Sequence, residues 1–414
     1  MTQPHFKQPS AGVTESAHPL PKDLPFLVRR VLSPATHIRC GSLRIGLPDG
    51  RELRIEGPEP GPEAELLIKD YHFARRLCTA GEIGFGEAYL AGEWESPNLA
   101  TLIELMSLNH DVIEDVMLGR LWTRLIQFLG HALKRNTRSG ARSNIKAHYD
   151  LGNAFYETWL DRTMTYSSAV FAPGDNDLAS AQTRKYRLLA ERVGVQGGDR
   201  VLEIGCGWGG FAEFAARELG CAVTGLTISK EQFDFATERM RKAGLDDRVT
   251  IAMRDYRDER GVYDRIVSIE MFEAVGEGFW PFFFRQMGER LRPGGTAGLQ
   301  VITIAERLWP SYRREIDFIR RYIFPGGMLP TASIMRGLGE KYGMPILNEW
   351  AFRLDYAATL AQWRERFLVA WPKLIPLGFD ERFKRMWEYY LAFCEGGFRG
   401  GTIDVRQMVF TKPG

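Results

Sequence analysis

The chain lacks several features that would point to common classes of protein. It has no stretch of about 18 uninterrupted apolar residues, so we expect no membrane-spanning helix. Its 54 basic and 52 acidic residues leave a net charge of only +2, which argues against a nucleic-acid binder. The cysteines are odd in number and match no disulfide framework or zinc site, which favours a reducing cytoplasm and no metal centre: Cys40, Cys78, Cys206, Cys221 and Cys394.

The length of 414 residues is enough for two domains with sizeable cores. Residues 1–22 are rich in proline, histidine, serine and glutamine and are predicted to form a disordered leader. Residues 23–110 are predicted to form a small α+β domain, because apolar and polar residues alternate around Pro48-Asp49-Gly50 in a hairpin pattern. We expect a helical linker over 111–142 and a catalytic domain over 143–414.

The predicted linker has two interpretations. Apolar residues recur at helical spacing over 111–134, and the segment ends in basic residues, namely Lys134, Arg135, Arg138 and Arg142. A core helix followed by a solvated linker is the simpler interpretation. The alternative is an interfacial helix that touches anionic lipid. The sequence pattern leaves both interpretations open.

Strands and helices alternate in the second half of the chain. The apolar segments predicted as strands are 199–204, 222–227, 249–253, 263–269 and 297–304. Residues 291–295 contain Pro-Gly-Gly and are predicted to form a turn before the last of these strands. Strands separated by helices predict a mostly parallel, doubly wound sheet of the Rossmann-like α/β class.

The most informative local motif is Glu203–Gly210, a glycine-rich turn between a predicted strand and a helix. Gly205 and Gly207 permit a tight turn and let a ligand approach the backbone. The motif lacks the Lys-Ser/Thr of a phosphate-binding loop, and its spacing is not that of a nicotinamide fingerprint. Glu203 can meet a cationic amine, which favours the amino-acid end of S-adenosylmethionine (SAM). The alternative is a purely structural turn.

Polar residues after the next two predicted strands support a nucleoside ligand. Thr227 and Gln232 follow the second strand, where a ribose or methionine end would be recognised. Asp255 and Tyr256 follow the third, where a carboxylate and an aromatic ring can recognise an adenine. Because ligands bind at the carboxyl ends of such strands, these residues are predicted to line one crevice.

At this point the chain resembles the cyclopropane-fatty-acyl-phospholipid synthases and the related mycolic-acid methyltransferases. The resemblance covers nearly the whole chain and includes Gly84–Trp94 in the first domain. Seven further motifs follow in order: Ala147–Asn153, Met164–Ala169, Val201–Gly210, Gly225–Ser229, Ser268–Glu273, Tyr322–Gly327 and Asp355–Leu360. The resemblance implies a SAM-dependent enzyme that adds a one-carbon unit to an acyl double bond through a carbocation, with Tyr166 and Ser167 assisting SAM binding.

The resemblance also implies a pocket that holds bicarbonate as the proton acceptor. The Glu, Tyr and Ile of that pocket match Glu273, Tyr356 and Ile304. Its Cys and His fall on Ser168 and Ile302, so two polar contacts differ here. We therefore expect the catalytic residues to come from the set Glu273, Tyr356, Glu270, Ser168, Ile302 and Ile304.

Glu270 is a further departure, because many synthases have glycine at that position. An additional carboxylate repels an anion at short range, so Glu270 could replace bicarbonate and accept the proton itself. It could also stabilise the cation by its charge. The alternatives are a residue at a helix N-terminus or an ion pair with an arginine. The resemblance thus leaves bicarbonate and Glu270 as two possible proton acceptors.

The predicted function is formation of a cyclopropane on an unsaturated phospholipid acyl chain, and the alternative is a fatty-acid C-methyltransferase that gives a methyl-branched or methylene chain.

An insertion over about 304–346 is expected to cover the acyl site. Aromatic faces can shelter the cation, and the candidates are Tyr166, Phe272, Tyr322 and Tyr356. Residues 280–284 are interpreted as core or as part of an acyl tunnel. We expect a cytoplasmic protein that is peripheral at the inner membrane surface, and the sequence leaves a homodimer open. A lipid-binding protein without activity and a small-molecule methyltransferase are the rival classes.

Overall fold

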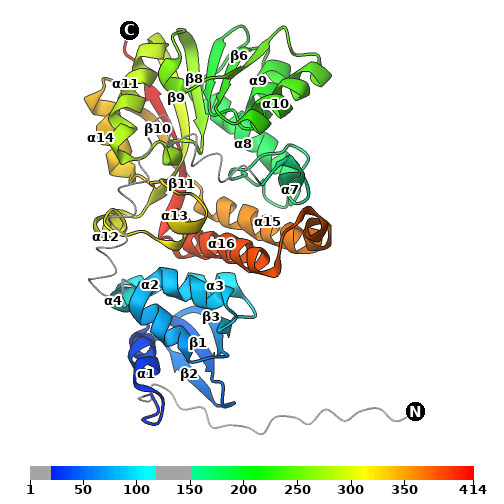
Figure 1. Ribbon diagram of the computed structural model, residues 1–414. Coiled ribbons are helices and arrows are strands. Elements are labelled where there is room, and N and C mark those ends of the chain that lie inside the picture. The colour runs from blue at the N-terminus through cyan, green and yellow to red at the C-terminus, as the bar shows by residue number, and fades with distance from the viewer. Residues whose placement is uncertain (1–19, 118–150) are drawn as a thin grey trace.

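The computed structural model describes residues 20–117 and 151–414 (Figure 1). The predicted leader lies almost entirely outside these residues. The basic end of the predicted linker, with Lys134, Arg135, Arg138 and Arg142, lies outside them as well. Within the described ranges, no helix is both long enough and apolar enough to cross a membrane.

The first part of the chain folds around a four-stranded sheet with the strand order β2-β1-β3-β4. The strands are β1 (Cys40–Gly46), β2 (Glu52–Glu56), β3 (Glu59–Ile68) and β4 (Trp94–Glu95). The predicted hairpin is present, since β1 and β2 pair antiparallel with Ile45 opposite Leu53. The helices around this sheet are α1 (Phe26–Leu32), α2 (His72–Leu90), α3 (Leu99–Leu108) and α4 (His110–Met117).

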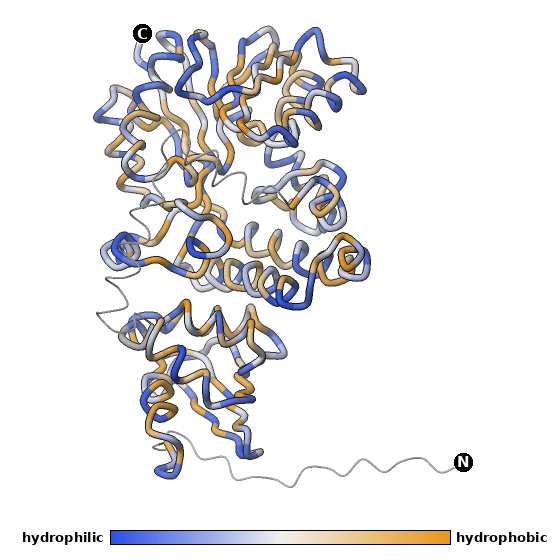
Figure 2. The backbone as a smooth tube through the Cα atoms, viewed as in Figure 1, coloured by the Kyte–Doolittle hydropathy of each residue, from blue (hydrophilic) through white to orange (hydrophobic). Residues whose placement is uncertain are grey.

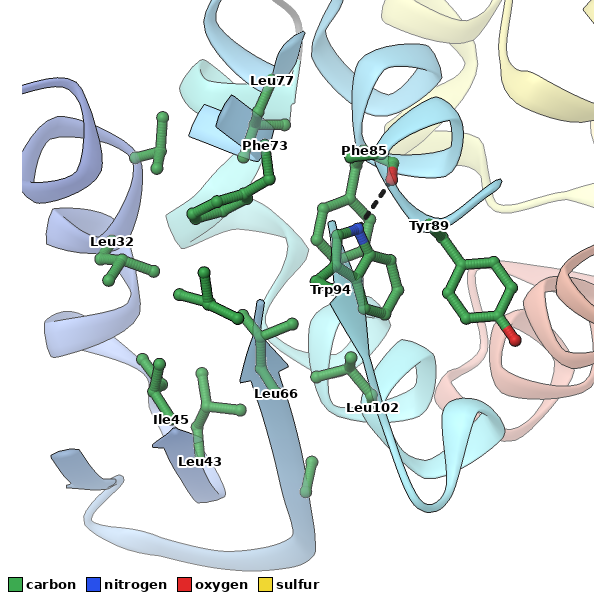
Figure 3. Close-up of a cluster of buried hydrophobic side chains, with 14 of the residues drawn as sticks. Leu32, Leu43, Ile45, Leu66, Phe73, Leu77, Phe85, Tyr89, Trp94 and Leu102 are labelled. Carbon is green, nitrogen blue, oxygen red and sulfur yellow. Dashed lines mark hydrogen bonds between the residues drawn. The ribbon is translucent and has the colours of Figure 1, made fainter. Parts of the chain in front are cut away.

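Trp94 is at the centre of the core of this N-terminal unit (Figure 3). The indole N–H donates a hydrogen bond of 2.9 Å to the carbonyl of Phe85, and the two rings stack 4.2 Å apart. Burial of the indole therefore leaves no unpaired donor, which is the condition for a stabilising buried tryptophan. Leu43, Ile45 and Leu66 of the sheet pack in the same cluster.

The second part of the chain contains a seven-stranded sheet with the order β10-β11-β9-β8-β5-β6-β7. The five strands that pair in parallel are β5 (Arg200–Ile204), β6 (Ala222–Thr227), β7 (Val249–Met253), β8 (Tyr263–Ile269) and β9 (Leu291–Ile304). The predicted Rossmann-like, doubly wound α/β class is confirmed.

Two strands at the other edge of this sheet were not predicted from the sequence. They are β10 (Ile346–Ala351) and β11 (Ile403–Thr411), and β11 pairs antiparallel with both β9 and β10. The predicted turn at 291–295 is wrong, because β9 already begins at Leu291. The reason is tertiary: the N–H of Gly294 donates to the carbonyl of Lys412, and the N–H of Lys412 donates to Gly295. The chain end therefore extends the pairing of β9.

Helices flank the seven-stranded sheet and lie beneath it in Figure 1. Those in the order of the chain are α7 (Asn153–Glu157), α8 (Leu178–Val193), α9 (Gly210–Glu218), α10 (Lys230–Ala243) and α11 (Trp280–Arg290). The segment over 304–346 contributes α12 (Trp309–Tyr312), α13 (Phe318–Tyr322) and α14 (Ala332–Lys341). The long helices α15 (Arg353–Leu374) and α16 (Glu381–Gly400) precede β11.

Helix α16 joins the two parts of the molecule by packing against α15 on one side and α3 on the other. A Cβ atom at Gly396 would lie 2.6 Å from the Cβ of Ile103 and 2.7 Å from the main-chain nitrogen of Glu104. Only a glycine therefore lets the two helices approach this closely. Figure 2 shows apolar stretches of the tube on both sides of this junction and along the strands of the large sheet.

Candidate active site

A cavity of about 500 Å³ lies where the carboxyl ends of β5, β6 and β8 face the helices of both parts of the chain. One wall comes from the N-terminal unit, and its lining residues include Glu82, Ile83, Phe85, Ile103 and Met106. The segment over 304–346 supplies another wall through Leu308, Tyr312, Ile316, Ile319, Phe324 and Met328. The cavity thus connects the glycine-rich loop with a largely apolar interior.

The glycine-rich loop follows β5 and leads into α9. Gly205 has a φ of 83° and Gly207 a φ of 52°, which is the left-handed region that favours glycine. A Cβ atom at Gly205 would also lie 2.7 Å from the side chain of Met271. The loop therefore needs glycine for its conformation and its packing, and its backbone borders the cavity.

Glu203 lies one residue before the end of β5 and is only 2% exposed. Its Oε2 atom has no hydrogen-bond partner among the described residues. Burial raises the pKa of Glu203 well above its usual range, although the positive charges of Lys185 and Arg239 offset part of the rise. A buried carboxylate with an unpaired oxygen is suited to a cationic ligand group, as the amine of SAM would be.

The polar residues predicted after β6 and β7 also line the cavity. The Thr227 hydroxyl donates a hydrogen bond of 2.9 Å to Oε1 of Gln232, which fixes the amide orientation. The Asp255 carboxylate accepts hydrogen bonds of 2.8 and 2.5 Å from the guanidinium of Arg257. The neighbouring Tyr256 packs 5.4 Å from Phe283. The structure brings these residues to the same end of the cavity as Glu203.

Tyr166 and Ser167 also line the cavity. The hydroxyls of Tyr166 and Tyr390 share a hydrogen bond of 2.7 Å. The Ser167 hydroxyl accepts a hydrogen bond of 2.6 Å from the ammonium of Lys185. Lys185 is fully buried, and burial lowers its pKa to about 7. Lys185 is not among the residues predicted for the site, because a lysine in an amphipathic helix carries no local sign of burial.

Glu270 follows β8 with a φ of 49°, which is unusual for a residue other than glycine. Its Oε1 accepts hydrogen bonds from the Ser168 N–H at 2.9 Å and from the Gln300 amide at 2.8 Å. Its Oε2 accepts a hydrogen bond of 2.6 Å from the Tyr356 hydroxyl. Burial raises the pKa of Glu270, and Lys185 opposes this rise. Glu270 is therefore neither the first residue of a helix nor the partner of an arginine.

Glu273 lies one turn further along and also lines the cavity. Its Oε1 accepts a hydrogen bond of 2.5 Å from the Ile302 N–H, whereas its Oε2 has no partner among the described residues. Burial, and then repulsion from Glu270, raise the pKa of Glu273 to about 8. The two carboxyls and Tyr356 are thus gathered at one end of the cavity, which we name the reaction end.

Three other predicted residues contribute in ways that the sequence could not specify. Ser168 is fully buried, and its hydroxyl donates to the carbonyl of Ala169 at 3.0 Å. It is absent from the described cavity lining, although the sequence places it among the candidate catalytic residues. Ile302 lines the cavity and anchors Glu273 through its N–H. Ile304 lines it too, but its N–H donates to Pro330.

The predicted aromatic shelter is only partly assembled. Tyr166 and Tyr356 line the cavity, and Tyr356 stacks on Phe398 with ring centroids 4.3 Å apart. Phe272 is instead in the core beneath the sheet, and Tyr322 bonds to Glu87; neither is among the described lining residues. Trp280, Phe283 and Phe284 belong to the same core cluster as Phe272, and none of residues 280–284 is in the described cavity lining, which favours the core over an acyl tunnel.

The fold and the glycine-rich loop are those of the SAM-dependent methyltransferase class. The family described as mycolic acid cyclopropane synthetase matches residues 136–408. The chain therefore belongs to this family, which includes cyclopropane synthases and fatty-acid methyltransferases, and the predicted resemblance is confirmed.

Two curated relatives span most of the chain. The tuberculostearic acid methyltransferase UfaA1 of Mycobacterium tuberculosis is 40% identical over 94% of this chain and 90% of its own length. The cyclopropane-fatty-acyl-phospholipid synthase of Escherichia coli is 37% identical over 87% of this chain and 90% of its own. Among solved structures, the mycolic acid cyclopropane synthase CmaA1 in complex with SAH and CTAB has a TM-score of 0.62 and 30% identity, covering 66% of this chain and 98% of that one.

Proposed function

We propose that the protein transfers the methyl carbon of SAM to the double bond of an unsaturated phospholipid acyl chain and releases a methylene-branched chain. The observation that carries this proposal is the Glu270 carboxylate, which three hydrogen bonds hold at the reaction end of the cavity. As a base of the protein itself, this carboxylate would take the role that the family resemblance gives to a bicarbonate ion.

The glycine-rich end of the cavity fits SAM. The unpaired oxygen of Glu203 would meet the cationic amine, and Gly205 and Gly207 would let the methionine end approach the backbone. The remaining proposed contacts are Tyr166, Ser167, Thr227, Gln232, Asp255 and Tyr256. Bound SAM supplies an electrophilic methyl group. The complex of CmaA1 with SAH supports this assignment.

The interior of the cavity fits an acyl chain. The segment over 304–346 lines it with apolar residues, including Leu308, Ile316, Ile319 and Phe324. Apolar lining removes hydrocarbon from water and excludes water from a cation formed on the chain. The phospholipid as the carrier of this chain is proposed from the resemblance and from the name of the Escherichia coli relative.

The groups at the reaction end can stabilise positive charge on the acyl chain. Ionised Glu270 attracts a cation directly, and the rings of Tyr166 and Tyr356 present polarisable faces. Glu270 then takes a proton from the carbon that has been added, so that the electrons of the broken C–H bond neutralise the cation. A bicarbonate ion beside ionised Glu270 would be repelled at short range, which favours Glu270 as the proton acceptor.

Two isomeric products satisfy this proton loss. If a hydride first moves between the two former double-bond carbons, the C–H electrons form a new C=C bond and the product is a methylene chain. If no hydride moves, they close a cyclopropane ring. Proton loss to Glu270 is common to both products. The departure of Glu270 from the glycine of many synthases and the 40% identity to a fatty-acid methyltransferase favour the methylene product. The ring is the second candidate, since Glu273 and Tyr356 match the synthase pocket and the Escherichia coli synthase is 37% identical.

Proton NMR of the lipid after incubation with SAM and vesicles of monounsaturated phospholipid distinguishes the products, which have equal mass. We expect vinylic methylene signals. Upfield ring-methylene signals would instead establish a cyclopropane synthase. The variant Glu270→Gly is the matched comparison, because glycine accepts the φ of 49° without strain and leaves room for an anion. We expect its activity to depend on added bicarbonate and its product to shift towards the ring.

A further inference from the structure

A chain of hydrogen bonds leads from the outer side of α8 to Glu270. The Arg192 guanidinium donates to Oε1 of Gln407 at 2.8 Å. The Gln407 amide nitrogen donates to Oε1 of Gln300 at 3.1 Å, and the Gln300 amide nitrogen donates to Oε1 of Glu270 at 2.8 Å. Both glutamines are buried, with exposures of 1% for Gln300 and 0% for Gln407. We name Arg192, Gln407 and Gln300 the relay.

The sheet fixes the geometry of the relay. Gln407 on β11 lies directly opposite Gln300 on β9, and Gln300 lies opposite Ile269, the residue before Glu270. The strands concerned are neighbours in the sheet (Figure 1). The outer end is also held, because the Arg192 guanidinium lies 4.2 Å above the ring of Trp350, which is opposite Gln407 on β10. The relay therefore runs across the sheet through residues that lie opposite one another on neighbouring strands.

The direction of every bond in the relay follows from its outer end. Arginine has donors only, so the Gln407 atom that faces Arg192 must be its oxygen. Gln407 then turns its NH2 group to Gln300, and Gln300 turns its own NH2 group to Glu270. Main-chain carbonyls agree with this direction, since those of Lys185 and Ser168 each lie 3.4 Å from the nearer amide nitrogen. Reversed amides would place oxygen against oxygen at both positions.

The relay determines which oxygen of Glu270 can take up a proton. Its Oε1 faces two N–H donors, from Gln300 and from the main chain of Ser168, so this oxygen can only accept. A proton can be added at Oε2, which faces the hydroxyl of Tyr356. Tyr356 can rotate its hydroxyl hydrogen, whereas the amide donors cannot leave their positions.

We propose that Arg192, Gln407 and Gln300 are positioning residues that keep Oε1 of Glu270 an acceptor and direct proton uptake from the substrate to Oε2. The inference rests on the proposed role of Glu270 as the base and extends it to three residues, none of them in the described cavity lining. Because Gln300 donates a hydrogen bond to Glu270, the relay favours the ionised carboxylate, whereas burial disfavours it.

The other charged groups around Glu270 come from three elements. Lys185 on α8 favours the ionised carboxylate, and Tyr356 on α15 donates to it. Glu273 in the segment after β8 repels it, and the repulsion contributes to the raised pKa of Glu273. Burial still raises the pKa of Glu270 overall, so the loss of a donor is expected to raise it further.

The variant Gln407→Glu reverses the relay at nearly constant volume. The substituted carboxylate still accepts from Arg192, but it attracts the NH2 group of Gln300 and turns the Gln300 oxygen towards Glu270. We expect the ionisation midpoint of Glu270 to rise by about one pH unit or more, a tenfold change in its ionisation constant. Infrared difference spectra would report the protonated carboxyl, assigned by its absence in Glu270→Gln. The acid limb of the turnover profile should shift by the same amount, with SAM affinity unchanged.

Three further variants control for the added charge. Gln407→Leu removes the relay without reversing it and should give a smaller shift. Arg192→Met removes the outer donor away from the buried core, and Arg192→Lys restores a donor and should restore the wild-type midpoint. Gln196→Glu makes the same chemical change at an exposed position and should shift nothing.

The outcomes separate the relay from the proposed function. A folded Gln407→Glu protein with an unchanged infrared midpoint would overturn the relay, as would equal shifts in Arg192→Lys and Arg192→Met. A shifted midpoint in a protein that methylates no lipid would support the relay and reject the proposed role of Glu270.

Discussion

Two buried carboxylates interact electrostatically with Lys185, and their surroundings differ. Glu203 lies one residue before the end of β5, close to the glycine-rich loop, and keeps one oxygen without a partner among the described residues. Glu270 follows β8, and both of its oxygens accept hydrogen bonds. Lys185 acts on both, since its positive charge opposes the raised pKa of each. Glu203 thus keeps an oxygen that a ligand can bond to, whereas hydrogen bonds within the protein already fix both oxygens of Glu270.

The difference follows from what each carboxylate has to do. A cationic ligand can replace the missing partner of Glu203, so the cost of burying an unpaired oxygen is recovered on binding. A base must instead face the reacting carbon in one orientation, and fixed donors supply that orientation without reorganisation. The contrast between Glu203 and Glu270 predicts that binding and turnover can be impaired separately.

The largest expected effect is on turnover in Glu270→Gln. Removal of the base should lower the turnover number by about 100-fold or more, the usual contribution of general acid–base catalysis. The affinity for SAM, measured by calorimetry, should stay within twofold, because Glu270 lies at the reaction end. Glu289→Gln, an exposed position on α11, is the matched control. Parallel loss of SAM affinity would remove the distinction between the two ends.

The converse effect is expected in Glu203→Gln. Loss of the charge that faces the SAM amine should weaken SAM binding by about 10- to 100-fold, as for a hydrogen bond to a charged group. Turnover at saturating SAM should change much less than in Glu270→Gln. Glu218→Gln at the exposed end of α9 serves as the control and should bind SAM normally. Unaltered SAM binding in Glu203→Gln would show that the unpaired oxygen serves another purpose.

The smallest expected effect is on stability, and it comes from the second carboxyl at the reaction end, Glu273. The folded-state pKa of Glu273, about 8, is above its ordinary value of 4.5, so the folded protein binds this proton more tightly. The free energy of unfolding should therefore fall as the pH rises from about 4.5 to about 8, by a few kcal/mol at most. Urea unfolding at several pH values should show a shallower fall in Glu273→Gln. Identical pH dependence in both proteins would argue against the raised pKa.

Much of the fold was predictable because its signals are local. Alternating polarity around Pro48-Asp49-Gly50 predicted the hairpin, and strands separated by helices predicted the doubly wound sheet. The strands β10 and β11 were not predictable, because β11 pairs with β9 across about a hundred residues of sequence. The same pairing extends β9 into the segment 291–295, whose Pro-Gly-Gly otherwise indicates a turn.

The sequence by itself determined the glycine-rich end of the cavity. Glu203, Gly205 and Gly207 are close along the chain, and a tight turn between a strand and a helix needs those residue types whatever surrounds them. Family motifs likewise identified Glu270, Glu273 and Tyr356 as residues of one site. Local sequence patterns could not predict the hydrogen-bond partners of these carboxylates.

Only the tertiary structure decided the surroundings of Glu270. Its donors come from segments around residues 168, 300 and 356, and the relay behind Gln300 adds Gln407 and Arg192. Lys185 is charged and yet fully buried, which helical periodicity cannot reveal. The physical reason is that hydrogen-bond direction and burial depend on which strands and helices become neighbours, and that is fixed only when the sheet is assembled.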